Sequence, residues 1–154
     1  MTRTIVVTRT LKASPEDLFA LLLDSDRLGA VPGVNVKILR EGTASRDDVG
    51  LKRRVGFPGG FIVEEVVGLR RDAPYRFDYR IRDATVKFRH DSGRIEFAPD
   101  PAGPGTKATW TSTFGISQSR LLRPVEVFGQ AAGHAAFWLA LAAFDRHLGS
   151  GRSA

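Results

Sequence analysis

The fold is decided by residues 121–148, which read LLRPVEVFGQAAGHAAFWLALAAFDRHL. Apolar residues recur there at helical spacing in two stripes, and Pro124 is tolerated only in a first turn, so we expect a helix that begins near Arg123. Two stripes predict a long helix that is buried around much of its girth. The first stripe is Leu121, Val125, Phe128, Ala132, Ala135, Leu139 and Ala142, and the second is Phe137, Leu141, Phe144 and Leu148.

Six segments upstream of this helix have the alternation and composition of β-strands. In the clearest one, Tyr75, Phe77, Tyr79 and Ile81 alternate with charged residues, which predicts one dry and one wet face. The turn residues between the segments leave only short connections, which predict an antiparallel meander. The segments are about 34–41, 50–57, 61–70, 74–82, 86–98 and 105–116.

A strand and two short helices are expected to precede the meander. Residues 3–12 alternate as a strand with Ile5, Val7, Arg9 and Leu11 on one side. Ser14 can cap a first helix that has Pro15 at its first position. Asp24-Ser25-Asp26 ends that helix and can cap a second one over residues 27–31, which stops at Pro32-Gly33.

This order of elements predicts an α+β fold of the helix-grip kind. A sheet of six or seven antiparallel strands with one dry face needs a cover, and the long helix is the only element large enough. A twisted sheet of this width curls, so we expect it to wrap the helix and leave an apolar cavity between them. We expect one domain over residues 1–149 and a flexible tail at 150–154.

The composition narrows the chemistry. The 154 residues include no cysteine, which excludes disulfides and thiolate chemistry. No metal-ligand spacing, phosphate loop or dinucleotide fingerprint is present, so we expect no metal and no cofactor. The first residues are too interrupted for a signal peptide, and residues 131–144 are too short to span a bilayer, so we expect a cytoplasmic protein.

The net charge of +6 raises the question of an anionic partner. The basic residues are scattered along strands, which favours a solvated surface. Arg76, Arg80 and Arg82 form a basic strip without interleaved exposed aromatic residues, so we expect no nucleic-acid binding. Peripheral contact with an anionic membrane is retained as an alternative.

A series of segments in this order resembles the START-like or helix-grip superfamily, often labelled SRPBCC, and within it the bacterial polyketide cyclase/dehydrase-like group. The resemblance implies an apolar cavity between sheet and helix. Members include lipid carriers, plant hormone receptors, pollen allergens and aromatase/cyclases, so the fold alone does not assign an activity. The matching segments are residues 13–19, 64–67, 72–81, 90–95 and 105–110, and the final helix.

Residues 23–28 and 31–34 are similar to a segment of a carbon monoxide dehydrogenase accessory protein family. That family shares the fold, and the resemblance implies maturation of a partner enzyme or its recruitment to a membrane. The later strands fit the cyclase-like group better.

We expect a hydrophobic small molecule, such as a lipid, polyketide or quinone, to bind in the cavity of a monomer or homodimer. A bulge at Ser92-Gly93 would change which side chains face inward, and an aromatic stripe is also what an ordinary core contains. Small residues at 129, 132, 133 and 136 indicate either close packing on the sheet or room for a guest. The candidate lining residues are Leu28, Val31, Phe77, Tyr79, Phe88, His90, Trp110, Phe114, Phe128, Ala132 and Leu139.

The alternative function is a cyclase or dehydratase that holds a polyketide-like chain in a reactive shape. His90 is then the first candidate for acid–base catalysis, followed by Tyr79 and Glu64. The competing interpretation of His90 is a hydrogen-bonded structural residue, since no nucleophile or paired acid accompanies it in the sequence.

Overall fold

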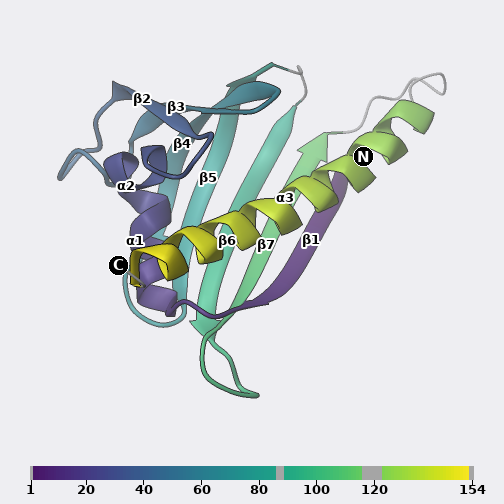
Figure 1. The fold of residues 1–154 in the computed structure, drawn as a ribbon. Coiled ribbons are helices and arrows are strands. Elements are labelled where there is room, and N and C mark those ends of the chain that lie inside the picture. Colours follow the sequence, from purple (N-terminus) through teal and green to yellow (C-terminus); the bar gives the residue numbers. More distant parts are fainter. Residues whose placement is uncertain (1, 86–88, 116–122, 153–154) are drawn as a thin grey trace.

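Seven antiparallel strands form one curved sheet in the order β1-β7-β6-β5-β4-β3-β2 (Figure 1). The structure, a computed structural model, describes the backbone of residues 2–85, 89–115 and 123–152, and within the last range the side chains of 131–150. The strands agree with the expected segments to within a few residues, so the meander is confirmed. They are β1 Thr2–Leu11, β2 Asn35–Arg40, β3 Lys52–Phe57, β4 Gly60–Arg70, β5 Tyr75–Ala84, β6 His90–Pro99 and β7 Thr106–Gly115.

Two short helices and one long helix complete the fold: α1 Pro15–Leu23, α2 Ser25–Gly29 and α3 Arg123–Arg152. Ser14 caps α1 by accepting from the Asp17 amide. Asp24 caps α2, which therefore begins two residues earlier than expected. Residues 150–152, expected to belong to a flexible tail, form the last turn of α3, because a glycine in a helix costs only about 1 kcal/mol and does not by itself end it.

Helix α3 crosses the concave face of the sheet obliquely, packing mainly on β1, and its C-terminal end meets α1 (Figure 1). Leu141 and Phe144 of the second stripe are buried, and Phe137 and Leu148 pack partly against the core. The first stripe is different: Ala132 and Ala135 are exposed and Leu139 is 65% exposed. Burial around much of the girth is therefore a wrong prediction, because alanine favours a helix whether or not it is buried.

Several contacts fix α3 to the first strand and the loop after it. The Asp145 carboxylate accepts hydrogen bonds from the amides of Lys12 and Ala13, at 2.8–3.1 Å. Arg9 donates to the Trp138 carbonyl at 2.9 Å, and its guanidinium lies 4.2 Å from the Trp138 ring centroid. A Cβ at Gly133 would lie 2.9 Å from Ile5 Cδ1, so this glycine permits close packing of helix on sheet.

An ion pair lies in the core where α1 joins α2. Arg53 is 0% exposed, and its Nε donates to Glu64 Oε1 at 2.8 Å. Its other nitrogens donate to the carbonyls of Leu22 and Leu23 and to Ser25 Oγ. The cation thereby satisfies carbonyl groups that the end of α1 leaves free. It also joins that end of α1 to β3 and β4.

We expect Arg53→Met to lower the free energy of unfolding by about 3 to 5 kcal/mol, because it leaves the Glu64 carboxylate buried without a partner. Urea denaturation measures the effect. The double variant Arg53→Met/Glu64→Leu should recover roughly half of the loss. Arg54→Met on the exposed side of the same strand is the control, with a change below about 1 kcal/mol. An unchanged midpoint for Arg53→Met would contradict this role.

Candidate functional site

A cluster of polar and aromatic side chains lies on the concave face at the centre of the sheet. It consists of Tyr79 on β5, His90 on β6, and Trp110 and Ser112 on β7. Tyr79 is 2% exposed, His90 8% and Ser112 0%. Because three adjacent strands supply these groups, the cluster depends on the pairing register of the sheet.

Two local features of β6 bring the cluster together. The pairing of β6 with β7 shifts register between His90 and Ser92, so His90 and Gly93 are both buried although they differ in parity. The expected bulge in this segment is therefore confirmed. Gly93 pairs with Tyr79 on one side and Ser112 on the other. A Cβ at Gly93 would overlap the Tyr79 ring, so the missing side chain lets that ring lie across β6.

Hydrogen bonds connect the cluster and fix its protonation pattern. The Ile81 amide donates to His90 Nδ1 at 3.0 Å, and His90 Nε2 lies 2.8 Å from Ser112 Oγ. Because Nδ1 accepts, the proton of the neutral imidazole is on Nε2 and is donated to Ser112. Trp110 Nε1 donates to Tyr79 Oη at 2.7 Å. The Tyr79 and His90 rings stack with their centroids 5.4 Å apart.

The cluster is uncharged near neutral pH. Burial lowers the pKa of His90 to about 4, with the Arg80 charge acting in the same direction and Asp91 opposing it. Burial also raises the pKa of Tyr79, and the negative charge of Glu64 adds to this effect. The imidazole is therefore neutral and the phenol protonated at pH 7.

The lowered pKa of His90 predicts acid lability. The unfolded chain takes up a proton near pH 6.5, whereas the folded chain does so only near pH 4, so stability is lost as pH falls through that window. We expect a loss of about 2 kcal/mol between pH 7 and pH 5. Urea denaturation at several pH values measures it, with His90→Gln showing little change over the same range. His134→Gln, at an exposed position of α3, should keep the wild-type dependence. Equal acid lability in His90→Gln would refute the assignment.

The geometry limits which of the candidate catalytic residues can act on a substrate. Both ring nitrogens of His90 are hydrogen-bonded within the protein. Glu64 is bound to Arg53 in the buried ion pair. Tyr79 is the candidate whose hydroxyl belongs to the cluster and is not held by an ion pair.

Apolar side chains surround the cluster and are only partly buried. Trp110 stacks on Phe137 of α3 with centroids 4.2 Å apart, and Phe114 meets His90 edge-on at 5.7 Å. Val36 and Val55 pair across β2 and β3, and Val55 shares the parity of the buried Arg53. This set, which we call the concave apolar surface, is Val36, Val55, Ile81, Trp110, Phe114 and Phe137.

The expected lining residues divide into four groups. The structure brings Phe77, Tyr79, His90, Trp110 and Phe114 together on the concave face. Leu28 and Val31 are buried in the hydrophobic core. Ala132 and Leu139 face solvent, so they do not lie between sheet and helix. Phe88 and the side chain of Phe128 lie outside the described residues.

Sequence reasoning missed other members of the site. Val55 lies in a strand rich in basic residues, and its partner Val36 lies in a short edge strand, so neither stands out. Phe137 was in the correct apolar stripe of the helix, and that stripe was the available signal. Arg53 had no signal beyond its parity with Val55.

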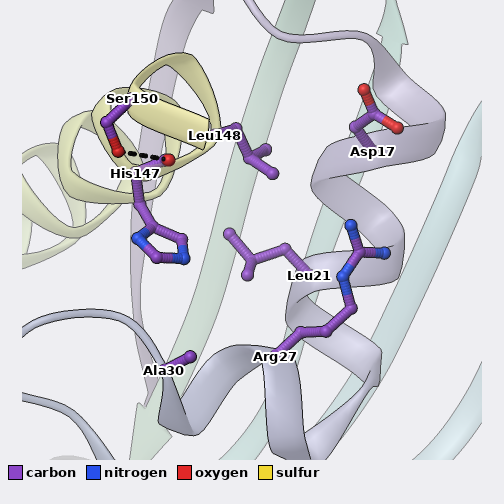
Figure 2. Close-up of a pocket in the computed structure, with 7 residues that line it drawn as sticks. All are labelled: Asp17, Leu21, Arg27, Ala30, His147, Leu148 and Ser150. Carbon is purple, nitrogen blue, oxygen red and sulfur yellow. Dashed lines mark hydrogen bonds between the residues drawn. The ribbon is translucent and has the colours of Figure 1, made fainter. Parts of the chain in front are cut away.

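A separate open pocket of about 450 Å³ lies where the C-terminal end of α3 meets α1 and α2 (Figure 2). Leu21 and Leu148 lie between the helices there, while Asp17, Arg27 and His147 supply polar groups. None of the expected lining residues belongs to it. In the described part of the chain, no group of three or more side chains is placed to hold a metal ion, and no helix is long and apolar enough to cross a membrane.

The curved sheet, the two short helices after β1 and the long helix on the concave face define a helix-grip protein. The sequence model of the family described as "Polyketide cyclase / dehydrase and lipid transport" matches residues 2–149, and the chain belongs to that family. The resemblance inferred from the sequence is thereby confirmed, and with it a fold that binds hydrophobic ligands. No curated protein matches the chain in sequence.

Solved structures share the fold at low sequence identity. A protein of unknown function from Staphylococcus aureus has a TM-score of 0.68 and 14% identity, over 100% of this chain and 98% of that one. A protein from Nitrosospira multiformis has a TM-score of 0.65 and 12% identity, over 94% of each chain. Ara h 8.0201 has a TM-score of 0.64 and 18% identity, over 97% of this chain and 99% of that one.

Proposed function

We propose that this protein binds a hydrophobic small molecule between the concave face of the sheet and α3. One observation carries the proposal: the concave apolar surface is partly exposed although it faces inward and adjoins a buried polar cluster. Pockets for small molecules combine apolar walls with a few convergent polar groups in this way. The family description, which includes lipid transport, supports the same class of ligand.

The position of α3 supports this site. The helix packs mainly on β1 and α1, whereas Val36, Val55 and Ile81 belong to strands on the other side of the sheet. Each of these side chains contributes apolar area that a ligand would remove from water, at about 25 cal/mol per Å². A lipid, polyketide or quinone has the apolar surface that such a site requires.

The cyclase or dehydratase alternative receives less support from the geometry. His90 has no free ring nitrogen with which to take a proton from a substrate, and its pKa is low. Glu64 is committed to Arg53. Of the three candidates, only Tyr79 retains a polar atom that a substrate could use.

Recruitment to an anionic membrane also receives less support. On β4 and β5, acidic side chains partly neutralise the basic strip. Glu65 forms ion pairs with Arg40 and Arg82, and these pairs lower its pKa. Asp78 forms ion pairs with Arg76 and Arg94. A neutralised strip attracts anionic lipid weakly.

Fluorescence titration with 1-aminoanthracene, an apolar and uncharged probe at pH 7, tests the proposal. We expect saturable binding of one probe per chain to the wild type. Val55→Trp, which fills space on the concave face, should weaken binding at least about tenfold, since overpacking excludes the guest. Val67→Trp is the matched control, because Val67 is an exposed residue of the adjacent strand β4, and it should bind like the wild type.

A third variant separates the concave face from the open pocket at the end of α3. Leu148→Trp fills that pocket and should leave probe binding unchanged. Loss of binding in Leu148→Trp with retention in Val55→Trp would move the site to the pocket. Absence of any saturable binding to the folded wild type would refute the proposed function.

A further inference from the structure

The hydrogen bonds of the buried cluster leave one proton without an acceptor. The four residues carry four donors: His90 Nε2–H, Ser112 Oγ–H, Tyr79 Oη–H and Trp110 Nε1–H. Three bonds link them, between His90 and Ser112, between Ser112 and Tyr79, and between Trp110 and Tyr79. Each bond uses one proton, so one donor remains whichever way the bonds run.

The remaining proton belongs to a hydroxyl group. His90 must donate to Ser112, because its other nitrogen accepts from the Ile81 amide, and the indole nitrogen of Trp110 can only donate. In the described part of the chain, no further acceptor is hydrogen-bonded to either the Ser112 or the Tyr79 hydroxyl. A buried donor left unpaired costs about 1 to 3 kcal/mol, so it indicates a place for a partner.

Tyr79 is the better placed of the two hydroxyl groups. Ser112 lies between the imidazole and the phenol, is bonded to both and is fully buried. The Tyr79 oxygen adjoins Trp110, which is only partly buried and belongs to the concave apolar surface. A phenol is also a stronger hydrogen-bond donor than an aliphatic alcohol, because it is more acidic.

The surroundings select an uncharged acceptor. His90 is neutral, and the guanidinium of Arg53 is already bound to Glu64 and to the end of α1. No cation among the described cluster residues can therefore compensate a carboxylate brought out of water. The negative charge of Glu64 acts on Tyr79 and further disfavours an anion there.

We propose that Tyr79 donates its hydroxyl proton to an oxygen of the bound molecule, so that the ligand is an uncharged apolar compound with a carbonyl acceptor, such as a ketone or a quinone. This inference rests on the proposed function and narrows it. It separates ketones and quinones from hydrocarbons, which offer no acceptor, and from fatty acids, which are anionic at pH 7. Ser112 and His90 are then positioning residues for the phenol.

Competition against 1-aminoanthracene with three tricyclic compounds tests the inference. Fluorenone and fluorene share one ring skeleton and differ in a carbonyl against a methylene, and fluorene-9-carboxylate adds a negative charge. We expect fluorenone to bind about tenfold more tightly than fluorene, as one net hydrogen bond allows. The carboxylate should bind more weakly than both. The infrared carbonyl stretch of bound fluorenone should fall relative to its value in hydrocarbon solvent.

Variants assign the donor. In Tyr79→Phe we expect the preference for fluorenone to fall to about onefold and the carbonyl stretch to return toward the hydrocarbon value. Tyr75→Phe is the matched control on the same strand, because Tyr75 packs against Phe19 outside the cluster, and it should keep both signals. Ser112→Ala, which retains the phenol, should also keep them and serves if Tyr79→Phe does not fold.

The outcomes distinguish the two proposals. Equal binding of fluorenone and fluorene to the wild type would overturn the inference and leave the proposed function standing. Persistence of the preference and of the lowered carbonyl stretch in folded Tyr79→Phe would also overturn it. If none of the three compounds and no probe binds to the folded wild type, the proposed function itself fails.

Discussion

The packing of one side of α3 against the sheet determines where the rest of the molecule is open or closed. Leu141 and Phe144 bury their side chains, and Asp145 holds the loop after β1 through two amides. These contacts fix the helix at the β1 side of the sheet. The opposite strands then present apolar side chains that the helix covers only in part. An inward-facing surface of this kind is the physical basis for a binding site in this fold.

The central cluster shows how a sheet can carry buried polar groups without carrying charge. His90 and Tyr79 both titrate in water, but burial keeps the first unprotonated and the second protonated. Their polar atoms are used within the protein, apart from one hydroxyl proton. The real buried charges, Arg53 and Glu64, neutralise one another at the α1–α2 junction. The structure thus separates the charges that support the fold from the neutral groups available to a ligand.

The strands and their facing could be predicted because alternation along β5 and turn residues between strands are local signals. The bulge in β6 was predictable from Ser92-Gly93, and it decided the facing of His90. The exposed side of α3 was not, because alanine raises apolar periodicity without requiring burial. The bonds from Arg53 to the end of α1 were also beyond the sequence, since they join residues about thirty positions apart. No local pattern encodes such a pairing.

The exposed alanine side of α3 has a practical consequence. The chain contains no cysteine, so a cysteine placed at Ala135 would be its sole thiol. That position faces solvent on the helix that borders the binding surface. A fluorophore or spin label attached there would report the environment of α3 from a single site without disturbing the core. Occupancy of the concave face could then be followed even for compounds that are themselves spectroscopically silent.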